Sequence, residues 1–316
     1  MIRLLVGCLM FAAATIALST PAQAGRFSLD RHEQGVRVEL DGRLFTEYLI
    51  DTGPKPILWP VIGPTGVEMT RAFPMEKRAG EKQDHPHQRS IWFTHGDVNG
   101  IDFWSENGNH GSIAHREYLT LLADDERAVL ATRNDWLAHD GKKVLEDQRT
   151  LTFRADENQR SIDFDIVLRA SDGPVTFGDT KEGSMGVRIP TVMDLNSNRG
   201  GHIVTSEGLT DKAAWGKPAA WVDYHGPIDG KLVGIAILNH PDSFRYPTRW
   251  HVRDYGLFAA NPFGLKDFIG DKAVDHAYAL EAGKTIALRY RIIFHRGDHQ
   301  EAGIDKAFED YSRLRP

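Results

Sequence analysis

Apolar and polar side chains alternate with a period of two over long stretches of this chain. Every second residue is a large apolar one in 161–168, and 286–294 repeats the pattern near the end. Successive side chains of a strand point to opposite faces of a sheet, so both segments are predicted as strands with one buried face. Shorter candidates, separated by Asp-Gly turn pairs, are 36–40, 44–50, 118–122, 128–134, 185–192, 232–238 and 250–258. Many strands at short spacing predict an all-β fold, a large antiparallel β-sandwich.

Residues 301–314 break this alternation. Their apolar side chains follow the i, i+3, i+4, i+7 spacing of one helix face, as Ile304, Ala307, Phe308 and Tyr311. An amphipathic helix is therefore predicted to close the chain against the sheet. No linker and no repeat of fixed period interrupts 25–316, which is predicted as a single β-sandwich domain.

The first 24 residues have the pattern of a secretory signal peptide. Arg3 precedes an apolar stretch over 4–18, and the small-residue pattern Ala22-Gln23-Ala24 ends the segment. Cleavage is predicted after Ala24, which places the mature protein in the periplasm or outside the cell. No later segment approaches the roughly 18 consecutive apolar residues of a membrane helix, so no membrane insertion is expected.

Cysteine usage and charge exclude several classes of function. The chain's single cysteine, Cys8, lies inside the signal, so the mature protein has no thiol for a disulfide, a nucleophile or a metal thiolate. The formal net charge is −6 and no basic run is present, which argues against a nucleic-acid partner.

Histidines concentrate between residues 85 and 115, which hold five of the 14. Pro86 favours extended neighbours, so the side chains at 85, 87 and 89 are expected on one side, and a continuing strand would add later odd positions. That side would carry His85, His87, Arg89, His95 and Asp97. Two imidazoles at i, i+2 can chelate a metal, or serve as a general acid and a substrate hydrogen-bond donor. The alternative is a pair of polar histidines at a loop mouth.

A second cluster lies between Gly178 and Gly183. Asp179, Lys181 and Glu182 form a compact loop of both charge signs, which could hold a carboxylate general base tuned by a cation. The alternative is a solvated hairpin turn, since turns favour Gly and Asp.

The third cluster falls in 247–264. If 250–258 is one strand, His251, Arg253 and Tyr255 share a face, which is an unusual composition for a core. Aromatic residues accompany the clusters, including Trp104 with the first and Tyr255 with the third. Aromatic rings beside polar donors suit a sugar ring, although tryptophan is also ordinary core filler.

These clusters together resemble a bacterial family labelled PmoA, or methane oxygenase PmoA, and also grouped as DUF6807. The matching stretches are 85–104, 178–183, 221–226, 250–256 and 261–264. Where the family often has a third histidine, this chain has Gln88. The resemblance implies secreted proteins that accompany sugar-degrading systems, a galactose-mutarotase-like supersandwich, and a substrate-binding place for Asn261. The membrane methane monooxygenase subunit spans the bilayer several times, so methane oxidation is not among the expectations.

The leading expectation is an exported carbohydrate-active enzyme using acid-base chemistry. A histidine of the first cluster would act as acid, with Asp179 or Glu182 as base, and His251 is a further catalytic candidate. Substrate contacts would come from Arg89, Asp97, Trp104, Lys181, Arg253, Tyr255 and Asn261. Epimerase, lyase and hydrolase reactions on a small-molecule or oligosaccharide ligand stay open.

Two other functions are weighed. The first is a metal-dependent enzyme, with His85 and His87 as ligands and a third from His95, His251 or a carboxylate. A divalent metal would then be the cofactor: iron or copper would permit an oxygenase, and zinc or calcium Lewis-acid chemistry. The second is a non-catalytic glycan-binding protein.

Overall fold

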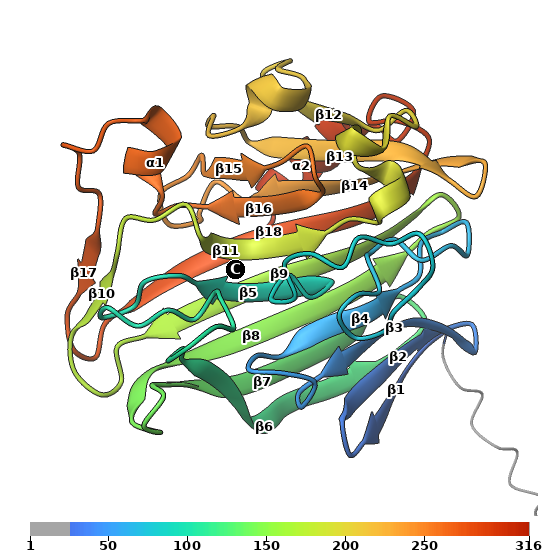
Figure 1. Ribbon diagram of the computed structural model, residues 1–316. Helices are drawn as coiled ribbons and strands as arrows, with labels where there is room; N and C mark the ends of the chain where they lie inside the picture. Colours follow the sequence, from blue (N-terminus) through green and yellow to red (C-terminus); the bar gives the residue numbers. More distant parts are fainter. Residues whose placement is uncertain (1–25, 316) are drawn as a thin grey trace, which may run out of the picture.

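Two eight-stranded antiparallel sheets stack on each other in the computed structural model, which describes residues 26–315 (Figure 1). The predicted signal lies outside the described residues. Sheet A has the order β1-β2-β3-β4-β5-β11-β16-β15, and sheet B has the order β12-β13-β14-β18-β9-β8-β7-β6. A two-stranded sheet, β10-β17, lies at one end. The expected large antiparallel β-sandwich is confirmed.

The elements have the following bounds. Sheet A consists of β1 (Phe27–His32), β2 (Gly35–Leu40), β3 (Arg43–Leu49), β4 (Ile57–Val61), β5 (Ile91–His95), β11 (Gly183–Arg188), β15 (Arg249–Val252) and β16 (Leu257–Asn261). Sheet B consists of β6 (Ser112–Ala123), β7 (Ala128–Leu137), β8 (Lys143–Ala155), β9 (Gln159–Arg169), β12 (His202–Thr205), β13 (Trp221–Ile228), β14 (Lys231–Asn239) and β18 (Thr285–Arg296). The remaining elements are β10 (Val175–Phe177), β17 (Tyr278–Leu280), α1 (Leu265–Ile269), α2 (Ile304–Ser312) and the 3-10 turns η1 (Thr191–Met193), η2 (Leu195–Ser197) and η3 (Asp211–Ala214).

The two segments with the longest alternation pair with each other. In β9 and β18, Ile162 lies opposite Ile292, and Ile166 lies opposite Leu288. These side chains are buried in the main core between the sheets, and their polar neighbours point the other way. Period-two patterning thus fixes which face of sheet B meets sheet A.

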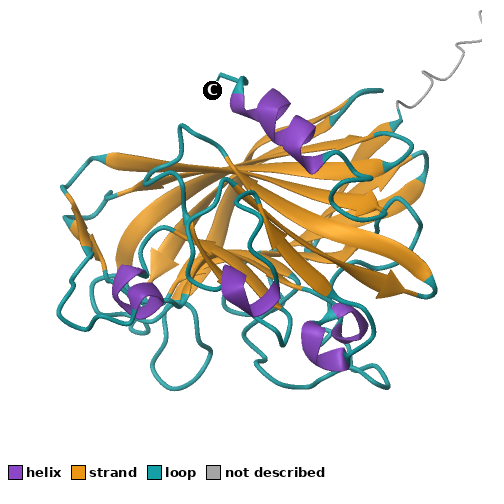
Figure 2. Cartoon of the chain, turned by 90° about the horizontal axis from the view of Figure 1, so that it is seen from above, coloured by secondary structure: helices purple, strands orange, loops and turns teal. Residues whose placement is uncertain are grey.

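The C-terminal helix is confirmed, with narrower bounds than the predicted 301–314. α2 begins after Gly303, whose φ of 64° is a left-handed conformation that glycine adopts without strain. Ile304 and Tyr311 pack with Trp221 on the outer face of sheet B. Figure 2 shows α2 on one side of the sandwich and the other short helices on the opposite side. Within 26–315, no helix combines the length and apolar character that a membrane crossing needs.

Three predicted strands have different bounds. The segment 250–258 is a hairpin of β15 and β16, because a turn that includes Gly256 (φ 100°) reverses the chain. The segment 185–192 ends as a strand at Arg188, before Pro190 and η1. The stretch before β5 is not extended, because His85 has a φ of 44° and lies in a tight turn.

A buried ion pair lies between the sheets. Arg149 and Asp147 of β8 are both fully buried, and the guanidinium Nη2 donates to Asp147 Oδ2 at 2.9 Å. The same carboxylate accepts hydrogen bonds from Asn134 Nδ2 at 2.6 Å and Trp136 Nε1 at 2.7 Å. Arg149 also lies 5.9 Å from the ring centre of Phe93 in sheet A. The network is thus a polar contact inside an otherwise apolar interface.

We expect Arg149→Met to lower the free energy of unfolding by about 3–5 kcal/mol, because it leaves the buried Asp147 carboxylate without its cation. The double variant Asp147→Leu/Arg149→Met removes both charges and should lose less. Urea unfolding curves measure both values. A single variant that is more stable than the double variant would contradict this role for the pair.

Candidate functional site

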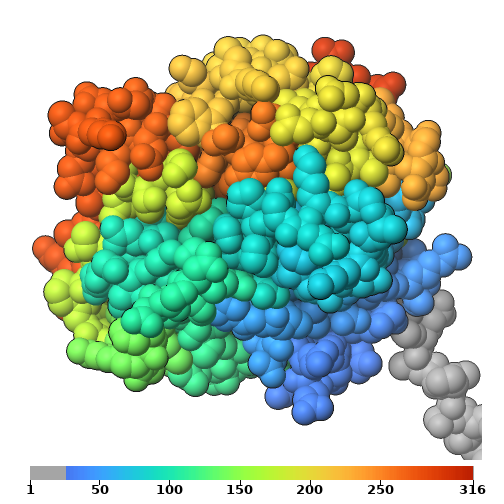
Figure 3. Space-filling model, viewed as in Figure 1, coloured from blue at the N-terminus to red at the C-terminus, as the bar shows by residue number. Residues whose placement is uncertain are grey.

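Several of the predicted site residues gather on the outer face of sheet A. Trp92 of β5, Arg188 of β11 and His251 of β15 point away from the main core, on the opposite side from their strand neighbours. The indole of Trp92 lies over Gly186, where an added Cβ would approach Trp92 Cζ2 to 2.6 Å. Sheet A therefore supplies the floor of the site. Loops cover it, and in Figure 3 the cyan and teal segment 70–110 spans the centre of this side.

An ionic clamp holds the loop that carries His85 and His87. Asp84 accepts hydrogen bonds at Oδ1 from Arg71 Nη1 at 2.5 Å and from Arg188 Nη2 at 2.8 Å. Both arginines are almost completely buried. Burial alone raises the pKa of Asp84, but the charges of Arg188 and Arg71 hold it below its usual value. Arg71 also donates to the backbone oxygen of His85 at 3.1 Å, so the clamp fixes the turn itself.

An aromatic stack joins the first and third clusters. The His85 ring stacks on Tyr255 with ring centres 4.9 Å apart and an interplanar angle of 5°. His87 lies edge-on to His85, with ring centres 5.7 Å apart, and 6.3 Å from Trp104. Arg253 lies 5.4 Å from the ring centre of Tyr255. The structure thus brings these five predicted residues together.

Beside this stack lies a buried network of three charges. Glu106 accepts two hydrogen bonds from Arg89, Nε to Oε1 at 2.8 Å and Nη2 to Oε2 at 2.6 Å. Lys55, which is 1% exposed, donates to Glu106 Oε1 at 2.8 Å. Burial raises the pKa of Glu106, but these hydrogen bonds hold it below its usual value. Arg89 also donates to Thr52 O at 2.9 Å. Because its guanidinium group is fully engaged, Arg89 holds together the loops that carry Thr52 and Glu106 beside the site.

Glu182 lies among the titratable groups of the site. Its carboxylate pairs with Lys181 Nζ at 2.9 Å and is about one third exposed. Its negative charge acts on the imidazoles of His87 and His251 and on the hydroxyl of Tyr255. The second cluster contacts the third directly, because Lys181 O lies 2.9 Å from His251 Nδ1, and the charge of Glu182 also acts on His87 of the first.

The imidazole of His251 has one free nitrogen. Its Nδ1 lies 2.9 Å from the backbone oxygen of Lys181, so Nδ1 carries the proton and donates. Its Nε2 is buried and has no hydrogen-bond partner among the described residues. The ring is 2% exposed and packs against Trp215 and Phe268. His251 therefore offers an unshared lone pair at Nε2.

Burial lowers the pKa of both His87 and His251. Burial, followed by the positive charge of Lys55, lowers the pKa of His87 to about 4. Burial likewise lowers the pKa of His251 to about 4, although the charge of Glu182 opposes this shift. Both imidazoles are therefore neutral at neutral pH, and each can accept a proton.

Four predicted residues lie elsewhere or have other partners. His95 faces the core side of β5, where Nε2 bonds Gly178 O at 2.9 Å and the ring packs 4.7 Å from Phe263. Asp97 accepts a hydrogen bond from Gly100 N at 2.9 Å in a turn. Asp179 is 4% exposed and accepts hydrogen bonds from the backbone nitrogens of Lys266 and His276. Asn261 donates to Thr180 O at 2.9 Å, so it positions the loop that carries Glu182.

Several residues of the site escaped sequence reasoning. No motif marks Lys55, Arg71 or Arg188, and Glu106 lies within the histidine-rich stretch 85–115 but is not singled out there. Their partners lie up to 104 residues away along the chain. A single sequence contains no signal for such long-range ion pairs.

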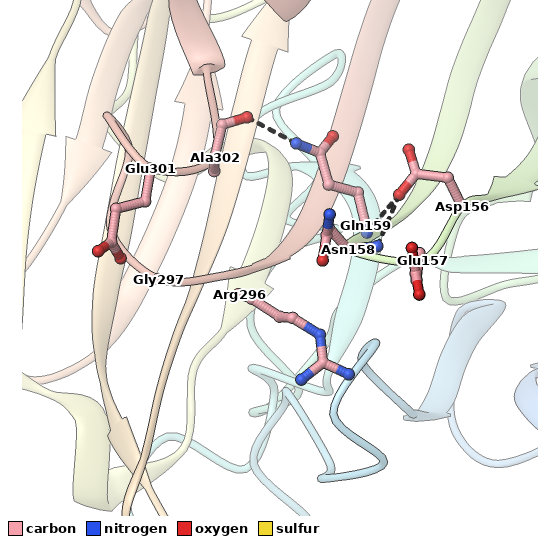
Figure 4. Close-up of a pocket in the computed structure, with 8 residues that line it drawn as sticks. All are labelled: Asp156, Glu157, Asn158, Gln159, Arg296, Gly297, Glu301 and Ala302. Carbon is pink, nitrogen blue, oxygen red and sulfur yellow. Dashed lines mark hydrogen bonds between the residues drawn. The ribbon is translucent and has the colours of Figure 1, made fainter.

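Two cavities differ in their relation to this site. One of about 350 Å³ is lined by Trp215 and Arg253, so it adjoins the Tyr255 stack. A second of about 480 Å³ lies at one end of the inner strands β8, β9 and β18 of sheet B, and is lined by Asp156 and Glu301 among others (Figure 4). There Asp156 accepts hydrogen bonds from the backbone nitrogens of its own turn, and Gln159 donates to Ala302 O at 2.6 Å. The first cavity therefore has the better chemistry for a ligand.

Metal-type ligands converge at another place in the fold. Within the described residues, the one group of three such side chains with ligand atoms within 4.8 Å of one another is Asp223, His225 and His299. It includes neither His85 nor His87. Within the described residues, the site on the outer face of sheet A therefore has two neighbouring imidazoles, His85 and His87, but no third ligand atom that completes such a group with both.

Replacing Asp84 with Asn should loosen the site. The change removes the counter-charge of two buried guanidinium groups, and we expect the free energy of unfolding to fall by about 3 kcal/mol. Protection of the 71–90 backbone from hydrogen exchange should fall with it. Urea unfolding and hydrogen exchange measure the two effects, with the exposed Asp140→Asn as control. Unchanged protection of 71–90 would show that the clamp does not order the loop.

Because of its buried histidines, the protein is expected to lose stability as the pH falls below neutral. His95 and His251 have a pKa of about 4 in the fold, because burial disfavours the charged ring, against 6.5 for the unperturbed ring. Between these values the unfolded chain binds more protons, so the stabilisation is complete above pH 6.5 and is lost as the pH falls towards 4. Each histidine contributes on the order of 3 kcal/mol to this fall.

His251→Gln should therefore show a shallower decline in the free energy of unfolding between pH 7 and pH 4.5 than the unmodified protein. The exposed His139→Gln should keep the full decline. Urea unfolding at a series of pH values makes the comparison. Parallel curves for the His251 variant and the unmodified protein would refute this assignment.

Similarity to solved structures covers most of the chain at low sequence identity. A galactose mutarotase-like protein from Clostridium acetobutylicum has a TM-score of 0.43 and 8% identity, over 87% of this chain and 100% of that one. A putative aldose 1-epimerase from Escherichia coli has a TM-score of 0.36 and 11% identity, over 87% and 97%. An alpha-galactosidase from Geobacillus stearothermophilus has a TM-score of 0.40 and 13% identity, over 87% of this chain and 39% of that one.

Family membership is clear from sequence. No curated protein matches the chain. The model of DUF6807, described as a family of unknown function, matches residues 35–309 and confirms the resemblance noted from the motifs. The chain therefore belongs to the DUF6807 family.

Proposed function

We propose that this protein is an exported enzyme that transfers protons on a carbohydrate or sugar derivative at the outer face of sheet A. The observation that carries the proposal is the free Nε2 of the buried His251, whose Nδ1 bonds Lys181 O, next to Glu182 in the chain. A carboxylate acts there on two neutral imidazoles, and one of these retains an unpartnered nitrogen. Titratable groups of this kind, beside a cavity and on three separate segments, are typical of acid-base sites.

The low pKa values of the two imidazoles support the reverse of the roles expected from the sequence, with histidine as the base. His87 and His251 begin unprotonated, so each first accepts a proton from the substrate and can return it to another atom. Glu182 stabilises the imidazolium that forms, since its charge favours the protonated ring. In this scheme Asp179 has a structural role, because its oxygens already accept hydrogen bonds from the backbone nitrogens of Lys266 and His276.

The walls suit a sugar ring. Trp215 offers an apolar ring face to the 350 Å³ cavity, and Arg253 lies 5.9 Å from its ring centre. An aromatic face contacts the C–H side of a sugar, and a guanidinium binds an anionic or carbonyl oxygen. Epimerisation, elimination and hydrolysis all require such proton transfer, so the proposal covers these three reaction classes.

The experiment is a substrate panel in D₂O followed by NMR. Aldoses, ketoses, uronates, keto-sugars and oligosaccharides are incubated with the tag-free protein, and deuterium at carbon, new double bonds and new reducing ends are scored. We expect Glu182→Gln and His87→Ala each to slow the active reaction by about 10²–10⁴-fold, the usual contribution of a positioned acid or base. His139→Gln serves as the matched control and should keep full activity.

The same panel separates the alternative functions. Turnover that survives Glu182→Gln would place the chemistry elsewhere. Ligand binding that survives His87→Ala, with no turnover in the unmodified protein, would favour a glycan-binding protein. Turnover that chelator abolishes and metal restores would favour the metal-dependent enzyme.

A further inference from the structure

A histidine row crosses the outer face of sheet B, on the opposite side of the sandwich from the proposed catalytic site. His202 of β12 pairs with His225 of β13, His225 pairs with Gly234 of β14, and Gly234 pairs with His295 of β18. Asp223 lies two residues before His225 and therefore on the same face. Asp223 and His225 belong to the 221–226 stretch, which the proposed function does not use.

Glycine at 234 makes this arrangement possible. A Cβ at that position would lie 2.4 Å from His295 Nε2 and 2.9 Å from His225 Cβ. Without a side chain there, the His295 ring reaches across β14 and its Nε2 lies 2.7 Å from Asp223 Oδ2. The other carboxylate oxygen, Oδ1, lies 2.6 Å from His225 Nδ1.

The turn between β18 and α2 completes the cluster. His299 lies in that turn, with its ring centre 5.8 Å from His225 and 6.0 Å from Trp221. Its Nδ1 is buried without a hydrogen-bond partner among the described residues. Ligand atoms of Asp223, His225 and His299 lie within 4.8 Å of one another. Asp223 is fully buried and His225 nearly so, although polar side chains without a structural or functional partner are usually exposed.

We propose that Asp223, His225 and His299 bind a divalent transition metal that fastens the C-terminal segment to sheet B. Two imidazoles and one carboxylate are a ligand set for Zn²⁺ or Fe²⁺. Metal binding at His225 Nδ1 breaks the hydrogen bond to Asp223 Oδ1, and the single proton of the neutral imidazole moves from Nδ1 to Nε2. His295 stays outside the ligand set and orients Asp223 through its other oxygen, the usual task of an outer-shell partner.

The position of His299 gives the metal a structural role. The turn that carries it leads directly into α2, whose Asp305 accepts a hydrogen bond from Trp221 Nε1 at 3.2 Å. A metal bound to β13 and to this turn therefore joins the end of the chain to the sheet. Because the metal binds only the folded form, it raises the melting temperature by an amount that grows with the logarithm of the metal concentration relative to its dissociation constant.

The test is calorimetric titration of tag-free, chelator-treated protein with ZnCl₂, together with CoCl₂ titration followed by visible absorption. We expect one equivalent of Zn²⁺, a raised melting temperature, and ligand-field bands of four- or five-coordinate cobalt. His299→Ala, in a surface turn, should weaken Zn²⁺ binding at least 100-fold. It should also show the circular dichroism and metal-free melting temperature of the unmodified protein.

Two controls keep the outcome decisive. His202→Ala removes an exposed imidazole whose ring centre is 5.8 Å from that of His225 but which is outside the ligand set, and should bind Zn²⁺ normally. The double variant His85→Ala/His87→Ala should also bind normally. Failure of the unmodified protein to bind Zn²⁺, Co²⁺, Mn²⁺ or Fe²⁺ overturns the proposal. So does binding that survives both His299→Ala and His225→Gln, or that disappears in the double variant.

Discussion

The carboxylate of Asp84 between two buried guanidinium groups is the interaction on which the proposed catalytic site depends. Arg188 belongs to β11, in the middle of sheet A, whereas Arg71 and Asp84 belong to the long loop between β4 and β5. The clamp therefore ties a segment without regular structure to a central strand. Two buried guanidinium groups would destabilise the fold without this shared carboxylate. The loop must therefore bring Asp84 to this position for the charges of Arg71 and Arg188 to be balanced.

Sheet A has a different task on each face. Phe93 of β5 and Met185 of β11 point into the main core, while Trp92 and Gly186 lie on the opposite face. Gly186 keeps that floor flat enough for the Trp92 indole to lie across it. The site thus rests on backbone that core packing already holds, and only its walls are loops.

Sequence alone predicted the periodic parts of this fold well. Alternation in 161–168 and 286–294 identifies two central strands, because a strand with one buried face must alternate. The site was harder to predict. His85 and His87 do lie together, yet through a tight turn and not through an extended segment. His95 lies on the core face of β5, because the turn before the strand breaks the parity assumed from His85. Lys55 and Glu106 meet only through tertiary structure.

The three clusters that form the site come from loops before β5, before β11 and between β15 and β16, and these strands are neighbours only after sheet A has formed. The pairings join residues far apart in sequence, such as Gly186 with Ala259. Contacts of this kind are gained only when a large chain loop closes, which slows folding. The chemistry of the chain therefore depends on the assembled sheet, and a fragment without one of these strands would lack the site.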